Sequence, residues 1–178
     1  VSEFRRRYQE SYRRYLRLRV EELREVGNNI WVSSTLRSLG YHVSPEDPSV
    51  LKAVEAQFNP LIRLVRLLPY VSETLMQIST QFKTGLVTNF TYTPTVHQIL
   101  RRLDIDRFFQ TVQVSHQVGF RKPHSKIFQA ALNSLSITPS EAVMVGDSPT
   151  EDILGAFQTG IRSILLHRPG LKYKKLSK

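Results

Sequence analysis

Residues 142–156 read AVMVGDSPTEDILGA and predict a strand, a tight turn and a helix, in that order. The apolar run at 142–145 has the length of a strand buried on both faces, and Gly146 ends it. Pro149 then stands where a helix begins, because proline suits the first helical turn. Two carboxylates, Asp147 and Asp152, therefore follow a buried strand, at the end where parallel sheets bind ligands.

Short apolar runs and helical stretches alternate through the rest of residues 68–178 as well. Strands are predicted at 85–88, 111–115, 142–145 and 162–166, in alternation with helices at 72–82, 94–103, 126–135 and 149–159. Strands that alternate with helices form a parallel sheet with helices on both faces. The sequence therefore predicts an α/β fold with a Rossmann-like parallel sheet.

Residues 1–67 carry a different, all-helical pattern. An amphipathic helix is predicted over 3–26, because aromatic and aliphatic residues recur there mostly at three- and four-residue steps. A second helix follows, and a third is expected to break or bend at Pro60. We therefore expect a small α-helical domain at 1–67 and an α/β core at 68–178.

Five polar residues follow the predicted strands or stand in the loop between two of them: Thr88, Asn89, Lys122, Asp147 and Asp152. Because the carboxyl ends of parallel strands meet at one edge of a sheet, we expect these side chains to converge. A lysine ammonium binds phosphate oxygens as a point charge, and carboxylates are ligands for Mg²⁺. The set predicts a site for a phosphate and a divalent cation.

Four of these residues also have a structural explanation. Thr88 can end a strand, and Lys122 can be a surface lysine. Asp147 can cap the following helix, and Asp152 stands in a first helical turn, where the helix dipole favours acids. The five histidines lack metal-ligand spacing and are expected to be structural or exposed.

Three segments resemble, in order, motifs of the haloacid dehalogenase (HAD) superfamily of hydrolases. LVTN at 86–89 is similar to its second motif, GFRKPHSKIF at 119–128 to its third, and GDSPTEDILGA at 146–156 to its fourth. The helical front is similar in position to the α-helical cap of many members. The resemblance implies a Mg²⁺-dependent hydrolase acting on a small phosphorylated substrate.

The resemblance also implies roles for individual residues. Thr88 and Lys122 would bind the phosphoryl group, with Asn89 as a secondary substrate-binding candidate. Asp147 and Asp152 would position Mg²⁺, and Lys122 and Asp147 are the catalytic candidates.

One expected motif is missing from these residues. HAD members carry Asp-x-Asp-x-Thr at the end of a central strand, where the first Asp attacks phosphorus and the second acts as acid and base. The one Asp-x-Asp in the chain runs from Asp104 to Asp106 and is expected to be a solvated loop, with Phe108 and Phe109 turned into the core.

Without a central strand, buried backbone groups would be left unpaired, at a cost of roughly 1–3 kcal/mol each. Three explanations are open: the natural protein has the strand outside this chain, the flanking strands pair directly, or a second copy covers the gap. The third predicts a homodimer.

Composition bears on partners and location. The formal charge is +10 and the pI about 10.1, which favours anionic partners. The charge is spread along the chain, and glutamates alternate with the arginines of the first helix, so nucleic acid is not the expected partner. There are no cysteines, no apolar run long enough to span a membrane and no signal-peptide pattern, which favours the cytoplasm.

Two functions follow from these observations. The first is phosphomonoester hydrolysis, with activity impaired in this chain because the nucleophilic aspartate is absent. The second is a non-catalytic HAD-like protein that dimerises and binds an anionic partner, which the charge of +10 favours.

Overall fold

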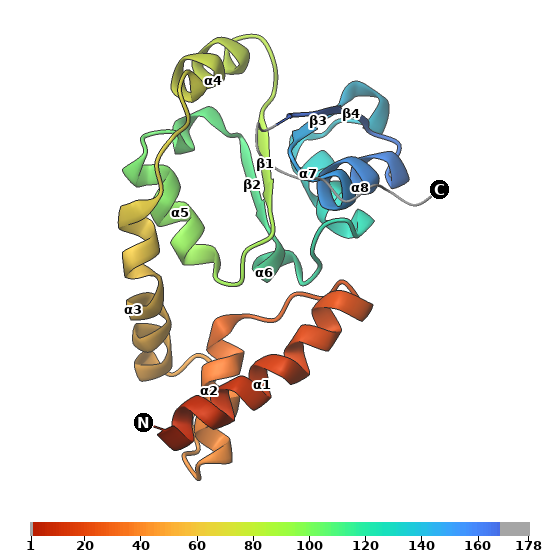
Figure 1. Ribbon diagram of the computed structural model, residues 1–178. Helices are drawn as coiled ribbons and strands as arrows, with labels where there is room; N and C mark the ends of the chain where they lie inside the picture. Colours follow the sequence, from red (N-terminus) through yellow and green to blue (C-terminus); the bar gives the residue numbers. More distant parts are fainter. Residues whose placement is uncertain (1, 168–178) are drawn as a thin grey trace.

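The computed structural model describes residues 2–167, and three helices form its lower part in Figure 1. They are α1 (Ser2–Glu21), α2 (Asn28–Ser38) and α3 (Pro48–Leu64). Their shared core contains Val32, Val50 and Val54, and Tyr92 from the second part of the chain packs into the same cluster. The helical part therefore rests on the α/β part through apolar contacts.

The end of the first helix differs from the prediction. α1 ends at Glu21 rather than near residue 26, because Leu23 takes a left-handed conformation with φ 53°. The backbone beyond it pairs with another loop: Glu25 N donates to Gly119 O at 3.0 Å, and Arg121 N donates to Leu23 O at 2.9 Å. Tertiary hydrogen bonds thus replace the last predicted helical turn.

The third helix does not break at Pro60, because α3 continues through this residue to Leu64, whereas the alternative expectation of a bend stays a prediction. A proline inside a helix removes one hydrogen bond and leaves the carbonyl four residues earlier without its partner. That residue, Ala56, is exposed, as is Pro60 itself. Water can therefore solvate the carbonyl, and the helix persists.

The α/β part begins with α4 (Val71–Ser79). Its other elements are, in chain order, β1 (Gly85–Thr88), α5 (Thr93–Arg102), the 3₁₀ helix η1 (Asp106–Phe108), β2 (Thr111–Val114), α6 (Ser115–Val118), α7 (Ser125–Leu135), η2 (Pro139–Glu141), β3 (Val143–Gly146), the π-helical turn η3 (Pro149–Ile153), α8 (Leu154–Gln158) and β4 (Arg162–Leu165). The predicted alternation is confirmed, and β1 has the predicted bounds.

The strands form two separate parallel pairs instead of one continuous sheet. β1 pairs with β2 in a register that sets Gly85 opposite Thr111. β3 pairs with β4 in a register that sets Gly146 opposite Leu165. Parallel α/β architecture is confirmed. Within residues 2–167, β1 and β3 do not pair directly, which removes one of the three explanations for the missing central strand.

The apolar faces of α5 and α7 cover the two faces of β1. On one face, Val96 and Leu100 of α5 pack with Leu86 of β1. On the other face, α7 contributes Phe128 and Leu132 to a cluster that receives Val87 of β1 and Met144 of β3. Alternate residues of a strand point to opposite faces, so β1 is covered on both. The same α7 cluster joins the two strand pairs through side chains.

The segment from Asp104 to Asp106 is confirmed as a surface turn. The side chain of Asp104 is 73% exposed and forms an ion pair with Arg107 at 3.1 Å. Phe108 is buried and Phe109 packs against the same core cluster. This Asp-x-Asp therefore lies outside the candidate site.

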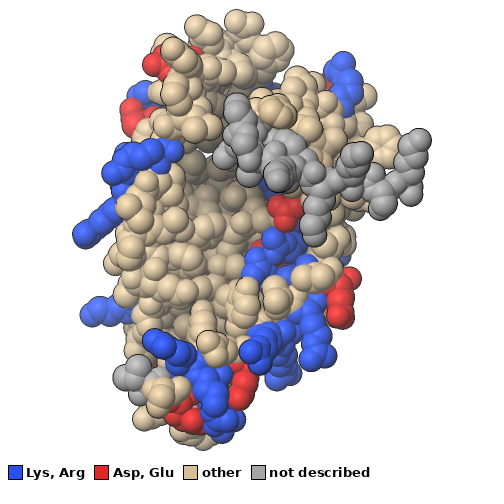
Figure 2. Space-filling model, in the orientation of Figure 1, with Lys and Arg blue, Asp and Glu red and all other residues tan. Residues whose placement is uncertain are grey.

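Lys and Arg side chains gather over α1, with glutamates between them (Figure 2). Arg6 and Arg7 both form ion pairs with Glu3 and Glu10, each pair three or four residues apart along the helix. Within residues 2–167, no helix is both long and apolar enough to span a membrane.

Candidate active site

The site is organised around an ion pair between Lys122 and Asp152. Lys122 lies in the loop between α6 and α7, and its Nζ stands 2.7 Å from Asp152 Oδ1. The same Nζ donates to Val87 O at 2.9 Å. The two side chains are only 11% and 5% exposed, so the pair is largely shielded from water. Lys122 thereby connects the end of β1 to the turn that follows β3.

Asn89 holds the backbone of Lys122. Its Oδ1 accepts from Lys122 N at 2.7 Å, and its Nδ2 donates to Lys122 O at 3.1 Å. An amide side chain that meets both polar groups of one residue fixes that residue in position and orientation. Asn89 follows β1 directly, so the strand sets the place of the lysine.

Asp152 is positioned by the turn after β3. Ser148 N donates to Asp152 Oδ2 at 3.0 Å, and Ser148 Oγ accepts from Glu151 N at 3.1 Å, which caps the turn. A Cβ on Gly146 would stand 2.4 Å from Asp152 Oδ2. Glycine is therefore required at the end of β3 for this carboxylate to approach the backbone.

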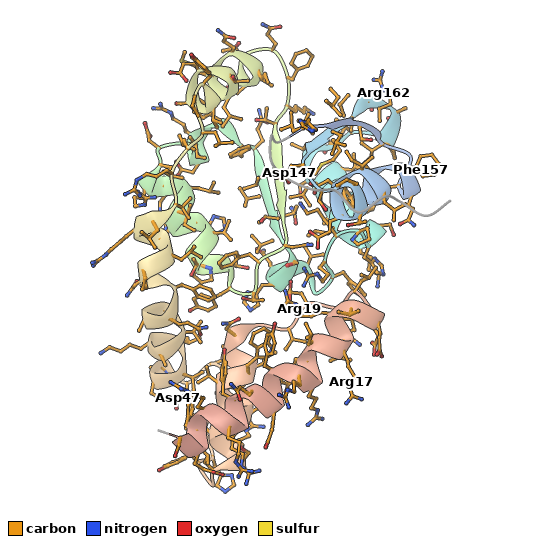
Figure 3. The ribbon with its side chains drawn as sticks, viewed as in Figure 1. Arg17, Arg19, Asp47, Asp147, Phe157 and Arg162 are labelled. Carbon is orange, nitrogen blue, oxygen red and sulfur yellow. The ribbon has the colours of Figure 1, made fainter. Side chains whose placement is uncertain are left out.

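A groove of about 570 Å³ opens beside the ion pair. Lys122, Asp147 and Asp152 line it, together with β1, β3 and α4. Figure 3 shows Asp147 between the two strand pairs. Among the described residues, Thr88 and Asn89 are not part of the lining. The structure therefore brings Lys122, Asp147 and Asp152 to one groove, and Thr88 stands at the end of the adjacent strand β1. The roles of these four residues and of Asn89 stay predictions.

The two carboxylates suit a hydrated Mg²⁺. Asp152 Oδ1 is buried and, among residues 2–167, has no hydrogen bond of good geometry, although Lys122 Nζ lies close to it. The described residues contain no cluster of three or more acidic or histidine side chains placed to hold a metal. Mg²⁺ keeps several waters and needs one or two protein carboxylates, so Asp147 and Asp152 fit this ion.

A second polar cluster joins the helical part to this site, and no sequence pattern predicted it. The carboxylate of Glu25 is fully buried and accepts from Ser115 Oγ at 2.7 Å. Arg19 Nε lies 3.0 Å from Glu25 Oε1, and Arg121 Nη1 lies 3.8 Å from Glu25 Oε2. Arg19 points from α1 toward the α/β part, whereas Arg17 points away from it (Figure 3). We call these four residues, Arg19, Glu25, Ser115 and Arg121, the junction cluster.

The junction cluster contacts both loops of the candidate site. Arg121 precedes Lys122 in the chain, and it also lies 3.4 Å from Glu151, the neighbour of Asp152. No sequence signal marked Glu25, because its burial depends on residues about 90 positions away. The signal for Asn89 was its place directly after a strand.

Histidines play structural roles near these loops. His116 Nδ1 accepts from Thr93 N at 3.1 Å, and burial lowers the pKa of His116 below 6.5, against a smaller opposing effect of Glu25. His124 Nδ1 accepts from Lys126 N at 3.1 Å and so caps α7. Both agree with the structural roles expected from the sequence.

Comparison with known proteins supports the resemblance seen in the motifs. The profile of the haloacid dehalogenase-like hydrolase family matches residues 7–166. A glyceraldehyde 3-phosphate phosphatase of Pyrococcus furiosus is 33% identical over 82% of this chain and 60% of its own length. A ribulose-1,5-bisphosphate 5-phosphatase of Halopiger xanaduensis is 33% identical over 72% of this chain and 54% of its own length.

A solved structure agrees. The 2-haloacid dehalogenase of Pseudomonas syringae pv. Tomato DC3000 has a TM-score of 0.63 and 26% identity over 82% of this chain and 60% of its own. The chain thus spans about 60% of the first phosphatase and of this dehalogenase. Because the family profile covers nearly the whole chain, this protein belongs to the haloacid dehalogenase-like hydrolases.

Proposed function

We propose that this chain provides the phosphate- and metal-binding part of a phosphomonoester hydrolase. The observation that carries the proposal is the buried Lys122–Asp152 pair at the edge of a groove that Asp147 also lines. A shielded ammonium beside two carboxylates can bind one phosphoryl group and one divalent cation together. Shielding from water strengthens both interactions.

The proposed division of roles combines the positions of Lys122, Asp147 and Asp152 beside the groove with the role predicted for Thr88 from the sequence. Lys122 Nζ binds a phosphoryl oxygen, and Thr88 at the end of β1 donates its hydroxyl to another. Asn89 keeps Lys122 in place through the two hydrogen bonds to its backbone. Asp147 and Asp152 hold Mg²⁺, which would neutralise charge on the transferring group.

Two relatives favour a small phosphorylated substrate. Their names give glyceraldehyde 3-phosphate and ribulose 1,5-bisphosphate as substrates. We propose the same class of substrate for this protein, with the helical part (residues 1–67) as a cap over the site. The 178 residues contain no Asp-x-Asp-x-Thr, so we expect little or no turnover from this chain by itself.

A non-catalytic binding protein is the second candidate. It is favoured by the formal charge of +10, carried in part by the arginines over α1 (Figure 2). In that case the groove would hold an anion without hydrolysing it, and a homodimer would cover the space between the strand pairs. A cytoplasmic location is proposed for either function.

The first test measures binding of inorganic phosphate by isothermal titration calorimetry in the presence of Mg²⁺. We expect Lys122→Met to weaken binding tenfold to about a hundredfold, since hydrogen bonds to charged groups contribute roughly 1.5–3 kcal/mol. Lys52→Met is the matched control, because Lys52 is an exposed lysine on α3. Equal binding by wild type and Lys122→Met, with both folded by circular dichroism, would refute the proposed site.

The second test separates hydrolysis from binding alone. Phosphate binding should strengthen when Mg²⁺ is added, and Asp152→Asn should lose this dependence. Hydrolysis of p-nitrophenyl phosphate is then measured with longer forms of the protein that include an Asp-x-Asp-x-Thr strand, if its reading frame encodes one. Mg²⁺-dependent turnover that Asp147→Asn abolishes supports the enzyme, whereas binding without turnover in such a form supports the second candidate.

A further inference from the structure

The segment that connects α1 to α2, residues 22–27, is hydrogen-bonded to two loops of the α/β part. Arg24 forms an isolated antiparallel bridge with Phe120, in the loop between α6 and α7. Asn28 N, at the start of α2, donates to Thr91 O at 3.2 Å, in the loop after β1. Figure 1 shows this segment next to α6, where the helical part meets the α/β part. One short segment thus contacts both loops that surround the candidate site.

The side chain of Glu25 connects this segment to the loop after β1. Its Oε2 accepts from Ser115 Oγ at 2.7 Å, and Ser115 Oγ accepts in turn from Phe90 N at 2.9 Å. Phe90 follows Asn89, whose side chain is hydrogen-bonded to both backbone groups of Lys122. A continuous series of hydrogen bonds, with one peptide bond between Phe90 and Asn89, therefore leads from Glu25 to Lys122.

A second connection runs through Arg121. Its Nη1 lies 3.8 Å from Glu25 Oε2, and its Nη2 lies 3.4 Å from Glu151 Oε1. Arg121 immediately precedes Lys122 in the chain, and Glu151 immediately precedes Asp152. The guanidinium of Arg121 therefore stands between Glu25 and the turn that carries the carboxylate partner of the lysine.

Burial strengthens both connections. The carboxylate of Glu25 is fully buried, and charged hydrogen bonds are stronger where the surroundings are less polar than water. On the side of the helical part, Arg19 Nε lies 3.0 Å from Glu25 Oε1, and the Arg19 guanidinium lies 5.7 Å from the centre of the Trp31 ring. Glu25 is therefore held by α1 and α2 as well as by the two loops.

We propose that Glu25 is a positioning residue for Lys122. It holds the loop after β1 and the loop before α7 at the separation that brings the lysine to Asp152 and to a bound phosphoryl group. Among residues 2–167, Glu25 is not part of the lining of the groove, so it acts through other residues. The effect on phosphate rests on the proposed function, whereas the fixed position of Lys122 does not. The helical part thereby sets the phosphate affinity of a site whose binding residues lie in the α/β part.

A direct effect of the Glu25 charge on the site has the opposite sign. Glu25→Gln keeps the size of the side chain and an oxygen that accepts from Ser115 Oγ, but it removes one negative charge. If charge alone mattered, the site would become more positive and would bind phosphate more tightly. If Glu25 positions Lys122, binding becomes weaker, because a neutral amide no longer attracts Arg121. The direction of the change therefore distinguishes the two effects.

The first measurement is isothermal titration calorimetry of the whole chain with inorganic phosphate and Mg²⁺. Glu25→Gln and Ser115→Ala should each weaken phosphate binding by about fivefold or more, as expected for residues of one hydrogen-bond network. Ile161→Ala is the matched control, because it removes buried side-chain atoms before β4, outside the junction cluster. It lowers stability and should leave phosphate binding unchanged. All proteins are compared at a temperature at which circular dichroism shows them folded.

The second measurement needs no ligand. The amide of Lys122 donates to Asn89 Oδ1 at 2.7 Å, so its hydrogen exchange reports how firmly the lysine is held. NMR of the chain labelled with ¹⁵N should show exchange of this amide faster by about fivefold or more in Glu25→Gln and Ser115→Ala. The amide of Leu132, buried in α7, is the internal control and should exchange at the same rate in wild type and in both variants.

Two outcomes would overturn the inference. In the first, the Lys122 amide exchanges at the wild-type rate in both variants. In the second, Glu25→Gln binds phosphate as tightly as wild type or more tightly. If wild type itself binds no phosphate while exchange of the Lys122 amide responds as expected, the proposed function fails and the positioning role of Glu25 is supported.

Discussion

Glu25 is a buried acid at the junction between the helical part and the α/β part. Its carboxylate has no solvent exposure and stands between two arginines that are themselves only 16–17% exposed. Removing one member of such a group leaves the others buried without a counter-charge, which costs more than the group contributes when intact. The junction cluster thus joins the helical part to the loop that carries Lys122.

We therefore expect Glu25→Ala to lower the free energy of unfolding by about 3 kcal/mol. Urea denaturation followed by circular dichroism measures this value. Glu73→Ala is the control, because Glu73 is an exposed acid on α4 and should change stability by less than about 0.5 kcal/mol. Equal effects of the two substitutions would show that the buried carboxylate adds nothing specific.

Among the helices, α7 and α8 pack closely beside the candidate site. Gly155 of α8 lies directly against the loop and helix that follow Lys122. A Cβ at this position would stand 2.4 Å from the Phe128 ring and 2.9 Å from the Cα of Pro123. Because the second atom belongs to the backbone, a rotamer change cannot relieve the clash.

Gly155→Ala should consequently destabilise the protein by roughly 1–3 kcal/mol, despite the better helix propensity of alanine. The thermal midpoint of unfolding reports this change. Gln158→Ala places alanine at an exposed position of the same helix and should leave the midpoint unchanged or slightly higher. If Gly155→Ala changed the thermal midpoint no more than Gln158→Ala does, the close packing between α7 and α8 would not make the glycine necessary for stability.

At the scale of the whole molecule, stability should depend on pH through His116. Burial lowers the pKa of His116 below 6.5, and its Nδ1 must be unprotonated to accept from Thr93 N. The unfolded chain then binds a proton more readily than the folded one. Stability is complete above about pH 6.5 and decreases as pH falls below that value.

His116→Asn should flatten this dependence, because asparagine can accept from Thr93 N without titrating. The comparison is urea denaturation of both proteins between about pH 7 and pH 5. Wild type should lose more stability than the variant over this interval. Parallel losses would mean that other groups cause the pH dependence.

Local apolar patterns were enough to predict most helices and strands. The strand at 85–88 and the helix that ends at Leu135 follow from local apolar patterns, which act over a few residues. The sequence also predicted that Lys122, Asp147 and Asp152 converge, because the order of strands and helices constrains where loops can go, and all three line one groove. The family was predicted from the three motifs at 86–89, 119–128 and 146–156.

Several other features depend on contacts between distant parts of the chain. The helical turn lost after Glu21, the burial of Glu25 and the persistence of α3 through Pro60 depend on partners or solvent that no local pattern specifies. The separation of β1 from β3 was decided in the same way: side chains of α7 hold the two strand pairs together, and within residues 2–167 no backbone ladder joins them. Long-range contacts of this kind form only when the chain is folded, so the sequence pattern could state alternatives but not choose among them.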